Sequence, residues 1–144
     1  MPHDATLEAF CAFFNNLDKD CTKSLYDVYT QDVVFTDPLH RIEGIQALEA
    51  YFAGMYENVR DCRFDYHDTQ QDGDTAFVTW TMHFAHPRLN GGHRISVEGC
   101  TRLEFAEDGR VRRHRDYFDA GAMLYEHVPL LGRAVRWLKR RASR

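Results

Sequence analysis

Residues 110–118 bring an imidazole and a carboxylate to one side of a predicted strand. Side chains alternate along a strand, so His114, Asp116 and Phe118 share one face. The other face carries two arginines and a tyrosine, which favours its exposure to solvent. A carboxylate and an imidazole on an apolar wall can donate and accept protons near neutral pH. The alternatives are a structural Asp–His pair that satisfies itself in the core, and a bulge that reverses the two faces.

A second candidate carboxylate stands before a proline. Asp37-Pro38 ends the β-rich run 33–36. Asp before Pro commonly starts a turn, so a turn role and a catalytic role both stay open for Asp37. His40 follows three residues later, either at the rim of a cavity or in a surface loop.

The histidines and cysteines show no metal-ligand spacing. The string HFAH places His83 and His86 three residues apart in a predicted strand, so their rings face opposite sides. The four cysteines form no CxxC pair, and we expect reduced thiols rather than a disulfide framework. We therefore expect no metal and no cofactor.

These residues need elements that hold them together. Helical spacing marks residues 5–17, residues 22–30 and a stretch that follows Gly44. From residue 62 the period changes to two, which predicts strands over 62–67, 76–84, 95–105 and 110–118. Successive strands joined by turns at this spacing indicate an antiparallel sheet with one buried face. Helices followed by such a sheet indicate an α+β fold, with the helices covering one face.

Composition limits the class of protein. The chain has 144 residues, of which 44% are hydrophobic, enough for one domain over 1–144 with a packed core. A formal net charge of −4 argues against a nucleic-acid binder. No window approaches the ~20 apolar residues of a membrane span. The first ten residues carry two acids and no basic group, so we expect no secretory signal and a cytoplasmic protein.

The order of elements resembles the nuclear transport factor 2-like superfamily, and within it the SnoaL-like and ketosteroid-isomerase-like small proteins. The strings that carry the resemblance are LYDVYTQDVVFTDP before a Gly-initiated helix, LEFAEDGRVRRH, and RDYFD. Together they cover roughly residues 5 to 125. The resemblance implies a cone-shaped α+β barrel, in which N-terminal helices pack on a strongly bent mixed or antiparallel sheet.

The resemblance also implies roles for single positions. In ketosteroid-isomerase-like members the aspartate of Asp-Pro is the general base, which here is Asp37. Their tyrosine and neutral carboxylic acid, which stabilise an oxyanion, fall on Phe13 and Thr101, so we do not expect steroid isomerisation. Limonene-epoxide-hydrolase-like relatives and SnoaL-like cyclases use an aspartate on a late strand, which here is Asp116. The partner arginine and second aspartate of the hydrolases have no match in 78–84.

We therefore expect an apolar pocket for a hydrophobic small molecule, with Asp37, His114 and Asp116 as catalytic candidates. The candidate ligand contacts are Phe13, Phe35, His40, Tyr56, Trp80, Met82, Thr101 and Phe118. The expected activity is acid–base catalysis of isomerase, cyclase or hydrolase type. The alternative is a non-catalytic binding module that forms a homodimer through the exposed sheet face, which carries Thr79 and Thr81.

The C-terminal segment 130–144 has the pattern of a basic amphipathic helix. Residues 133–144 hold six basic groups and no acid, and apolar residues accompany them at helical spacing. Such a helix usually docks on its own body or on a partner subunit. The alternative is a position on an anionic membrane surface.

Overall fold

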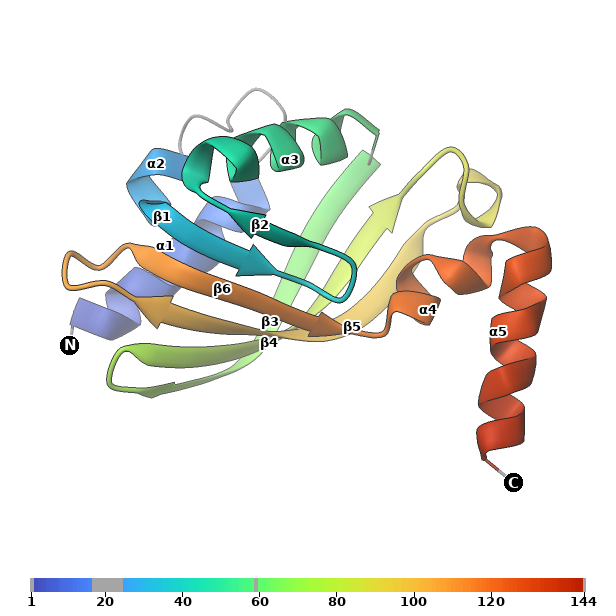
Figure 1. The fold of residues 1–144 in the computed structure, drawn as a ribbon. Helices are drawn as coiled ribbons and strands as arrows, with labels where there is room; N and C mark the ends of the chain where they lie inside the picture. The colour runs from blue at the N-terminus through green and yellow to red at the C-terminus, as the bar shows by residue number, and fades with distance from the viewer. Residues whose placement is uncertain (1, 17–24, 59, 144) are drawn as a thin grey trace.

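The computed structural model describes residues 2–16, 25–58 and 60–143 (Figure 1). Its helices are α1 (Pro2–Asn16), α2 (Leu25–Val28), α3 (Ile45–Asn58), α4 (Ala120–Met123) and α5 (Pro129–Ala142). Its strands are β1 (Tyr29–Thr36), β2 (Arg41–Glu43), β3 (Arg60–Asp72), β4 (Thr75–Ala85), β5 (Ile95–Phe105) and β6 (Val111–Phe118). Two short 3₁₀ helices, η2 (Asn90–Gly92) and η3 (Tyr125–His127), complete the order.

The strands form one sheet in the order β2-β1-β6-β5-β4-β3. The pair β1–β6 is parallel and the other neighbours are antiparallel, so the sheet is mixed. Helix α1 contacts β3, and α3 contacts β1 and β2, while the sheet bends around them (Figure 1). The expected cone-shaped α+β fold is confirmed. The sheet has two edge strands, β2 and β3, so it is an open cone and does not close into a barrel.

The core lies between the helices and the concave face of the sheet. Apolar side chains at alternate positions of β4 and β5 are buried, as the period of two predicts. Phe14 of α1 meets Phe52 of α3 and Phe64 of β3 in edge-to-face contacts. These rings join the two layers and set the depth of the space between them.

A β-bulge in β6 sets which side chains point inward. Phe105 pairs with Val111, but Glu104 pairs with Arg113, so Arg112 is an extra residue in the ladder. Because of this insertion, Val111 and His114 are both buried although strict alternation would separate them. The arginines of β6 lie on the exposed face.

The second helix is shorter than predicted. It ends at Val28, and Tyr29 and Thr30 belong to β1; residues 22–24 of the predicted helix lie outside the described part. Tyr29 pairs with Val111 of β6, a partner more than 80 residues away. This long-range pairing overrides the local helical spacing. A short window of sequence contains no sign of such a pairing.

Helix α5 projects from the end of the molecule opposite the N-terminus (Figure 1). It packs against η3, which links it to α4. Among the residues that the structure describes, no helix is both long and apolar enough to cross a bilayer.

Candidate functional site

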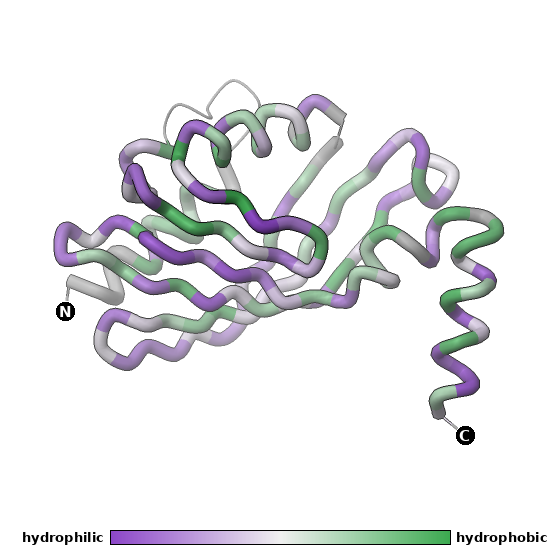
Figure 2. The backbone as a smooth tube through the Cα atoms, viewed as in Figure 1, coloured by the Kyte–Doolittle hydropathy of each residue, from purple (hydrophilic) through white to green (hydrophobic). Residues whose placement is uncertain are grey.

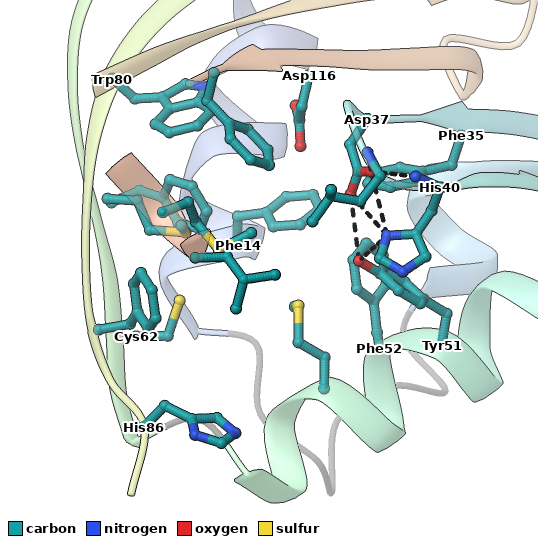
Figure 3. Close-up of a pocket in the computed structure, with 18 of the residues that line it drawn as sticks. Phe14, Phe35, Asp37, His40, Tyr51, Phe52, Cys62, Trp80, His86 and Asp116 are labelled. Carbon is teal, nitrogen blue, oxygen red and sulfur yellow. Dashed lines mark hydrogen bonds and ion pairs between the residues drawn. The ribbon is translucent and has the colours of Figure 1, made fainter. Parts of the chain in front are cut away.

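A cavity of about 390 Å³ lies between the concave face of the sheet and the helices (Figure 3). Most of its wall is apolar, with side chains from α1, α3, the strands and the segment around α4. Examples are Phe14, Phe52, Phe64, Met82, Phe84 and Leu124. The polar exceptions include two carboxylates, Asp37 and Asp116, which line the same cavity although they are far apart in sequence. A largely apolar chamber with a few polar groups suits a small apolar ligand.

Asp116 is held by a chain of buried and partly buried hydrogen bonds. The Trp80 indole N–H donates to Thr101 Oγ1 at 2.7 Å, and the Thr101 hydroxyl donates to Asp116 Oδ1 at 2.6 Å. His114 Nε2 lies 2.7 Å from the same oxygen, and the hydroxyl of Tyr29 lies 2.6 Å from His114 Nδ1. Among the described residues no hydrogen bond reaches Asp116 Oδ2, and the carboxylate points toward the cavity (Figure 3).

The donors in this chain fit an ionised Asp116. An indole N–H can only donate, so the hydroxyl hydrogen of Thr101 is free for the carboxylate. If Tyr29 donates to His114 Nδ1, the neutral imidazole carries its hydrogen on Nε2 and donates to Asp116. The His114 side chain is only 3% exposed and that of Asp116 is 18% exposed. One carboxylate oxygen is therefore fixed by donors, which leaves the other for a guest.

Asp37 lies in a turn that its own side chain organises. Its Oδ1 accepts hydrogen bonds from the backbone N–H groups of Leu39 and His40, at 2.8 and 2.7 Å. Its Oδ2 accepts a hydrogen bond of 3.3 Å from the Tyr51 hydroxyl of α3. The His40 Nδ1 lies 3.2 Å from Oδ1 (Figure 3). The side chain of Asp37 is 7% exposed and that of His40 is 45% exposed, which places His40 at the rim.

Both carboxylates affect the pKa of the Tyr51 hydroxyl. Burial raises the pKa of Tyr51 well above its usual range, and the charge and hydrogen bond of Asp37 raise it further. The charge of Asp116 acts in the same direction. Tyr51 therefore stays protonated over the physiological pH range and remains a hydrogen-bond donor at the cavity wall.

The cavity wall offers little to a metal or a phosphate. No group of three His, Cys, Asp or Glu side chains that could hold a metal is found in 2–16, 25–58 and 60–143. Neither lysine nor arginine is among the described residues that line the cavity. The polar chemistry of this wall comes from its carboxylates, the Tyr51 hydroxyl, the Cys62 thiol and the imidazoles of His40 and His86.

The family model described as the SnoaL-like domain matches residues 7–114 of the chain. The chain belongs to the SnoaL-like family. A search of the curated proteins gives no match to this SnoaL-like chain.

Solved structures share the fold of this SnoaL-like protein. A protein from a Jannaschia species, described as a SnoaL-like polyketide cyclase, has a TM-score of 0.73 and 16% identity, and the match covers 85% of this chain and 89% of that one. An epoxide hydrolase of the limonene-epoxide-hydrolase-like type from M. tuberculosis has a TM-score of 0.68 and 23% identity, with 85% and 86% covered. A nuclear transport factor 2-like protein of unknown function from Burkholderia pseudomallei has a TM-score of 0.74 and 15% identity, with 86% and 95% covered. At these identities the likeness concerns the fold.

The structure of this SnoaL-like chain brings most of the predicted site residues to one cavity. Besides Asp37 and Asp116, the wall contains Phe35, His40, Trp80, Met82 and Phe118. Three predicted residues are not part of the wall. His114 and Thr101 lie behind Asp116 and hold it, and the partly buried Phe13 packs beside Phe14 against the core. The side chain of Tyr56 lies outside the described part of the structure.

Sequence reasoning missed several residues of the site. Tyr51 belongs to the predicted helical stretch that follows Gly44, and Tyr29 belongs to the predicted helix 22–30, and neither position indicates a site. Each hydroxyl meets a partner from another element, 14 residues away for Tyr51 and 85 residues away for Tyr29, so spacing could not reveal the contact. The one available signal is that each is a tyrosine in an apolar stripe, since a buried hydroxyl needs a partner. Cys62 and His86, which also line the cavity, carried no signal.

Proposed function

We propose that this protein is a general acid–base catalyst that acts on an apolar small molecule, with Asp116 as the carboxylate that exchanges a proton with the substrate. The observation that carries the proposal is the position of Asp116. One of its oxygens is fixed by Thr101 and His114, and the carboxylate faces an apolar cavity. A carboxylate in such a wall has a fixed direction and little competing water, which favours proton transfer to or from a bound guest.

Asp37 and Tyr51 form the second proton-transfer group of this proposal. They line the same cavity and are joined by a hydrogen bond. The Tyr51 hydroxyl is neutral and can donate to a substrate oxygen on which charge develops. The Asp37 carboxylate, which accepts this hydroxyl in the absence of a guest, can itself take up a proton that the substrate loses when the hydroxyl turns to the substrate oxygen. Two such groups at different points of one wall suit reactions that remove a proton at one atom and return one at another.

Three reaction types share this requirement. They are isomerisation next to a carbonyl group, ring closure through a carbanion, and hydrolysis in which a carboxylate activates water. The folds of a protein described as a polyketide cyclase and of an epoxide hydrolase are similar to this one, which supports the second and third types. The apolar wall supports a hydrophobic substrate for all three.

In this proposal His114 and Thr101 are positioning residues. Both nitrogens of His114 are used, one by Tyr29 and one by Asp116, and the ring is buried. A ring in this place cannot meet a guest directly. It orients Asp116 and stabilises its ionised form.

The test compares three Asp→Asn variants with two apolar probes. Proton exchange next to the carbonyl of 2-tetralone is followed in D₂O by NMR, and hydrolysis of styrene oxide by gas chromatography. Asp116→Asn is expected to slow the faster of the two reactions by about 10²-fold or more, and Asp37→Asn to slow it by a smaller factor. Asp65→Asn, which removes a carboxylate on the exposed sheet face, is the matched control and leaves the rate unchanged. Unchanged rates in both cavity variants would contradict the proposal.

The second candidate function is a non-catalytic binding module. The specific observation in its favour is that the cavity holds neither a lysine nor an arginine in the described part of its wall. In this case the wild-type protein binds 2-tetralone and returns it without deuterium. The homodimer through the exposed sheet face belongs to this proposal. Light scattering of the wild type and of Tyr117→Glu, a change on that face, tests it.

A further inference from the structure

Helix α5 is attached to the molecule by its polar side. Lys139 pairs with Asp119 and Glu126, and the guanidinium of Arg136 donates to the backbone carbonyl of Glu126. Gly132 lies so close to the same carbonyl that an added Cβ would overlap it. With 3.6 residues per turn, Gly132, Arg136 and Lys139 share one side of the helix. This side faces the body.

The apolar side of α5 therefore points away from the protein. Leu130 is 81% exposed, Trp137 53% and Leu138 58%. They share the opposite side of the helix, together with Ala134. A helix that docks on its own body normally buries its apolar stripe, and here the reverse holds. In Figure 2 hydrophobic and hydrophilic residues alternate along α5, and the helix stands clear of the sheet.

The charges around this apolar side are all positive. Arg133 and Arg140 border it next to Trp137, and Arg141 lies within it with its guanidinium 5.5 Å from the centre of the Trp137 ring. Arg133, Arg140 and Arg141 have no acidic partner among the residues that the structure describes. By contrast, the rest of the chain is strongly acidic, since six of the 18 basic residues and none of the 22 acidic ones lie in 133–144.

We propose that α5 docks on an anionic lipid surface, with Leu130, Trp137 and Leu138 in the interface and the arginines among the lipid headgroups. A helix with a charged polar side, leucine and tryptophan on the other side and low net hydrophobicity lies in the plane of such an interface. Long arginine side chains reach headgroup phosphates while their stems stay in apolar surroundings. Tryptophan is enriched at the same depth.

A second copy of the chain fits this face less well. Two α5 helices packed by their apolar sides would bring Arg141 of each copy into the contact, where like charges repel. Outside α5 the large exposed apolar residues of the described chain are Tyr26, Phe77 and Tyr117, which belong to three different elements, α2, β4 and β6. A nucleic acid would use the arginines but would leave the leucines and Trp137 in water.

The experiment is co-sedimentation of the full-length protein with vesicles. Vesicles of phosphatidylcholine and phosphatidylglycerol at 7:3 are compared with vesicles of phosphatidylcholine alone. We expect the wild type to sediment with the anionic vesicles and at least tenfold more weakly with the neutral ones. Leu130→Ser/Leu138→Ser and Arg133→Ser/Arg140→Ser each weaken binding to anionic vesicles at least tenfold. The emission of Trp137 shifts to shorter wavelength on binding, a change that Trp137→Phe removes.

The matched control is Arg113→Ser/Arg115→Ser, which removes two charges from the exposed sheet face and leaves vesicle binding unchanged. Far-UV circular dichroism confirms that each variant is folded. Absence of binding to anionic vesicles, or equal binding by Leu130→Ser/Leu138→Ser, would overturn the proposal. A wild-type dimer that this leucine variant converts to a monomer without lipid would assign the face to a second copy and would also overturn it.

Discussion

At the scale of single residues, the site depends on hydroxyl groups that hold carboxylates. Thr101 donates to Asp116, and Tyr51 donates to Asp37. A buried hydroxyl costs free energy unless it is hydrogen-bonded. Each therefore fixes its carboxylate and is itself fixed, and this mutual satisfaction keeps two acids at defined points of an apolar wall.

Tyr51 makes the stability of the protein depend on alkaline pH. Burial and the neighbouring Asp37 raise its pKa in the folded state above the unfolded value of about 10. The folded state thus holds this proton more tightly, and its contribution to stability is complete below pH ~10 and is lost as the pH rises further. Between pH 8 and 10.5 we expect the free energy of unfolding to fall more in the wild type than in Tyr51→Phe, measured by urea denaturation.

The control for this measurement is Tyr117→Phe, which removes an exposed tyrosine on β6. This variant should keep the pH dependence of the wild type. An equal pH dependence in the wild type and in Tyr51→Phe would show that Tyr51 does not hold its proton more tightly in the folded state.

At the scale of elements, a glycine in β5 makes room for the indole that starts the Asp116 chain. Gly99 is the direct partner of Trp80 on β4. A Cβ at Gly99 would overlap three carbons of the indole ring. Glycine inside a strand commonly marks such a close approach, and here it lets the Trp80 N–H reach Thr101.

Gly99→Ala is therefore expected to displace Trp80 and to lower the free energy of unfolding by about 1–3 kcal/mol. The matched control is Gly54→Ala in α3, where an added Cβ meets nothing within 4 Å. There the better helix propensity of alanine should raise stability by roughly 0.5–1 kcal/mol. Urea denaturation measures both. A neutral Gly99→Ala would mean that the indole moves without loss.

Some strands can be predicted from the sequence alone and others cannot. Alternation correctly predicts β4 and β5 and their buried faces, because each is long and one-sided. The same rule leaves the orientation of β6 open, since Val111 has the parity of the arginines. The bulge at Arg112 resolves it, and a bulge depends on the pairing with β5, which a single strand does not encode.

The site residues likewise fall into those that the sequence indicates and those that depend on tertiary packing. The sequence and its family resemblance indicate Asp37 and Asp116, which the fold brings to one cavity. Tyr51 and Tyr29 could not be assigned, because their hydroxyls find partners 14 and 85 residues away. Such contacts depend on how α3 and β1 lie against the turn at residue 37 and against β6. They follow from tertiary packing rather than from local pattern.

At the scale of the whole molecule, the cavity is a space that packing has left open. Its wall draws on α1, α3, the sheet and α4, so no single element defines it. Filling it should remove ligand binding and preserve the fold. Met82→Trp places a larger side chain into the wall from β4, and we expect at least tenfold weaker binding of 1-aminoanthracene, a neutral apolar fluorophore, in a fluorescence titration.

Phe77→Trp is the matched control on the same strand, because Phe77 is exposed on the other face. This variant keeps the affinity of the wild type. Undiminished binding by Met82→Trp would place the fluorophore outside the cavity.

The segment 119–126 serves two parts of the molecule at once. Met123 and Leu124 form one wall of the cavity, while Asp119 and Glu126 form ion pairs with Lys139 of α5. A change in the tilt of α5 should therefore displace segment 119–126 and with it this wall of the cavity. If docking of α5 on a surface changes the affinity of the cavity for a ligand, then binding of that ligand changes the affinity of α5 for the surface by the same factor.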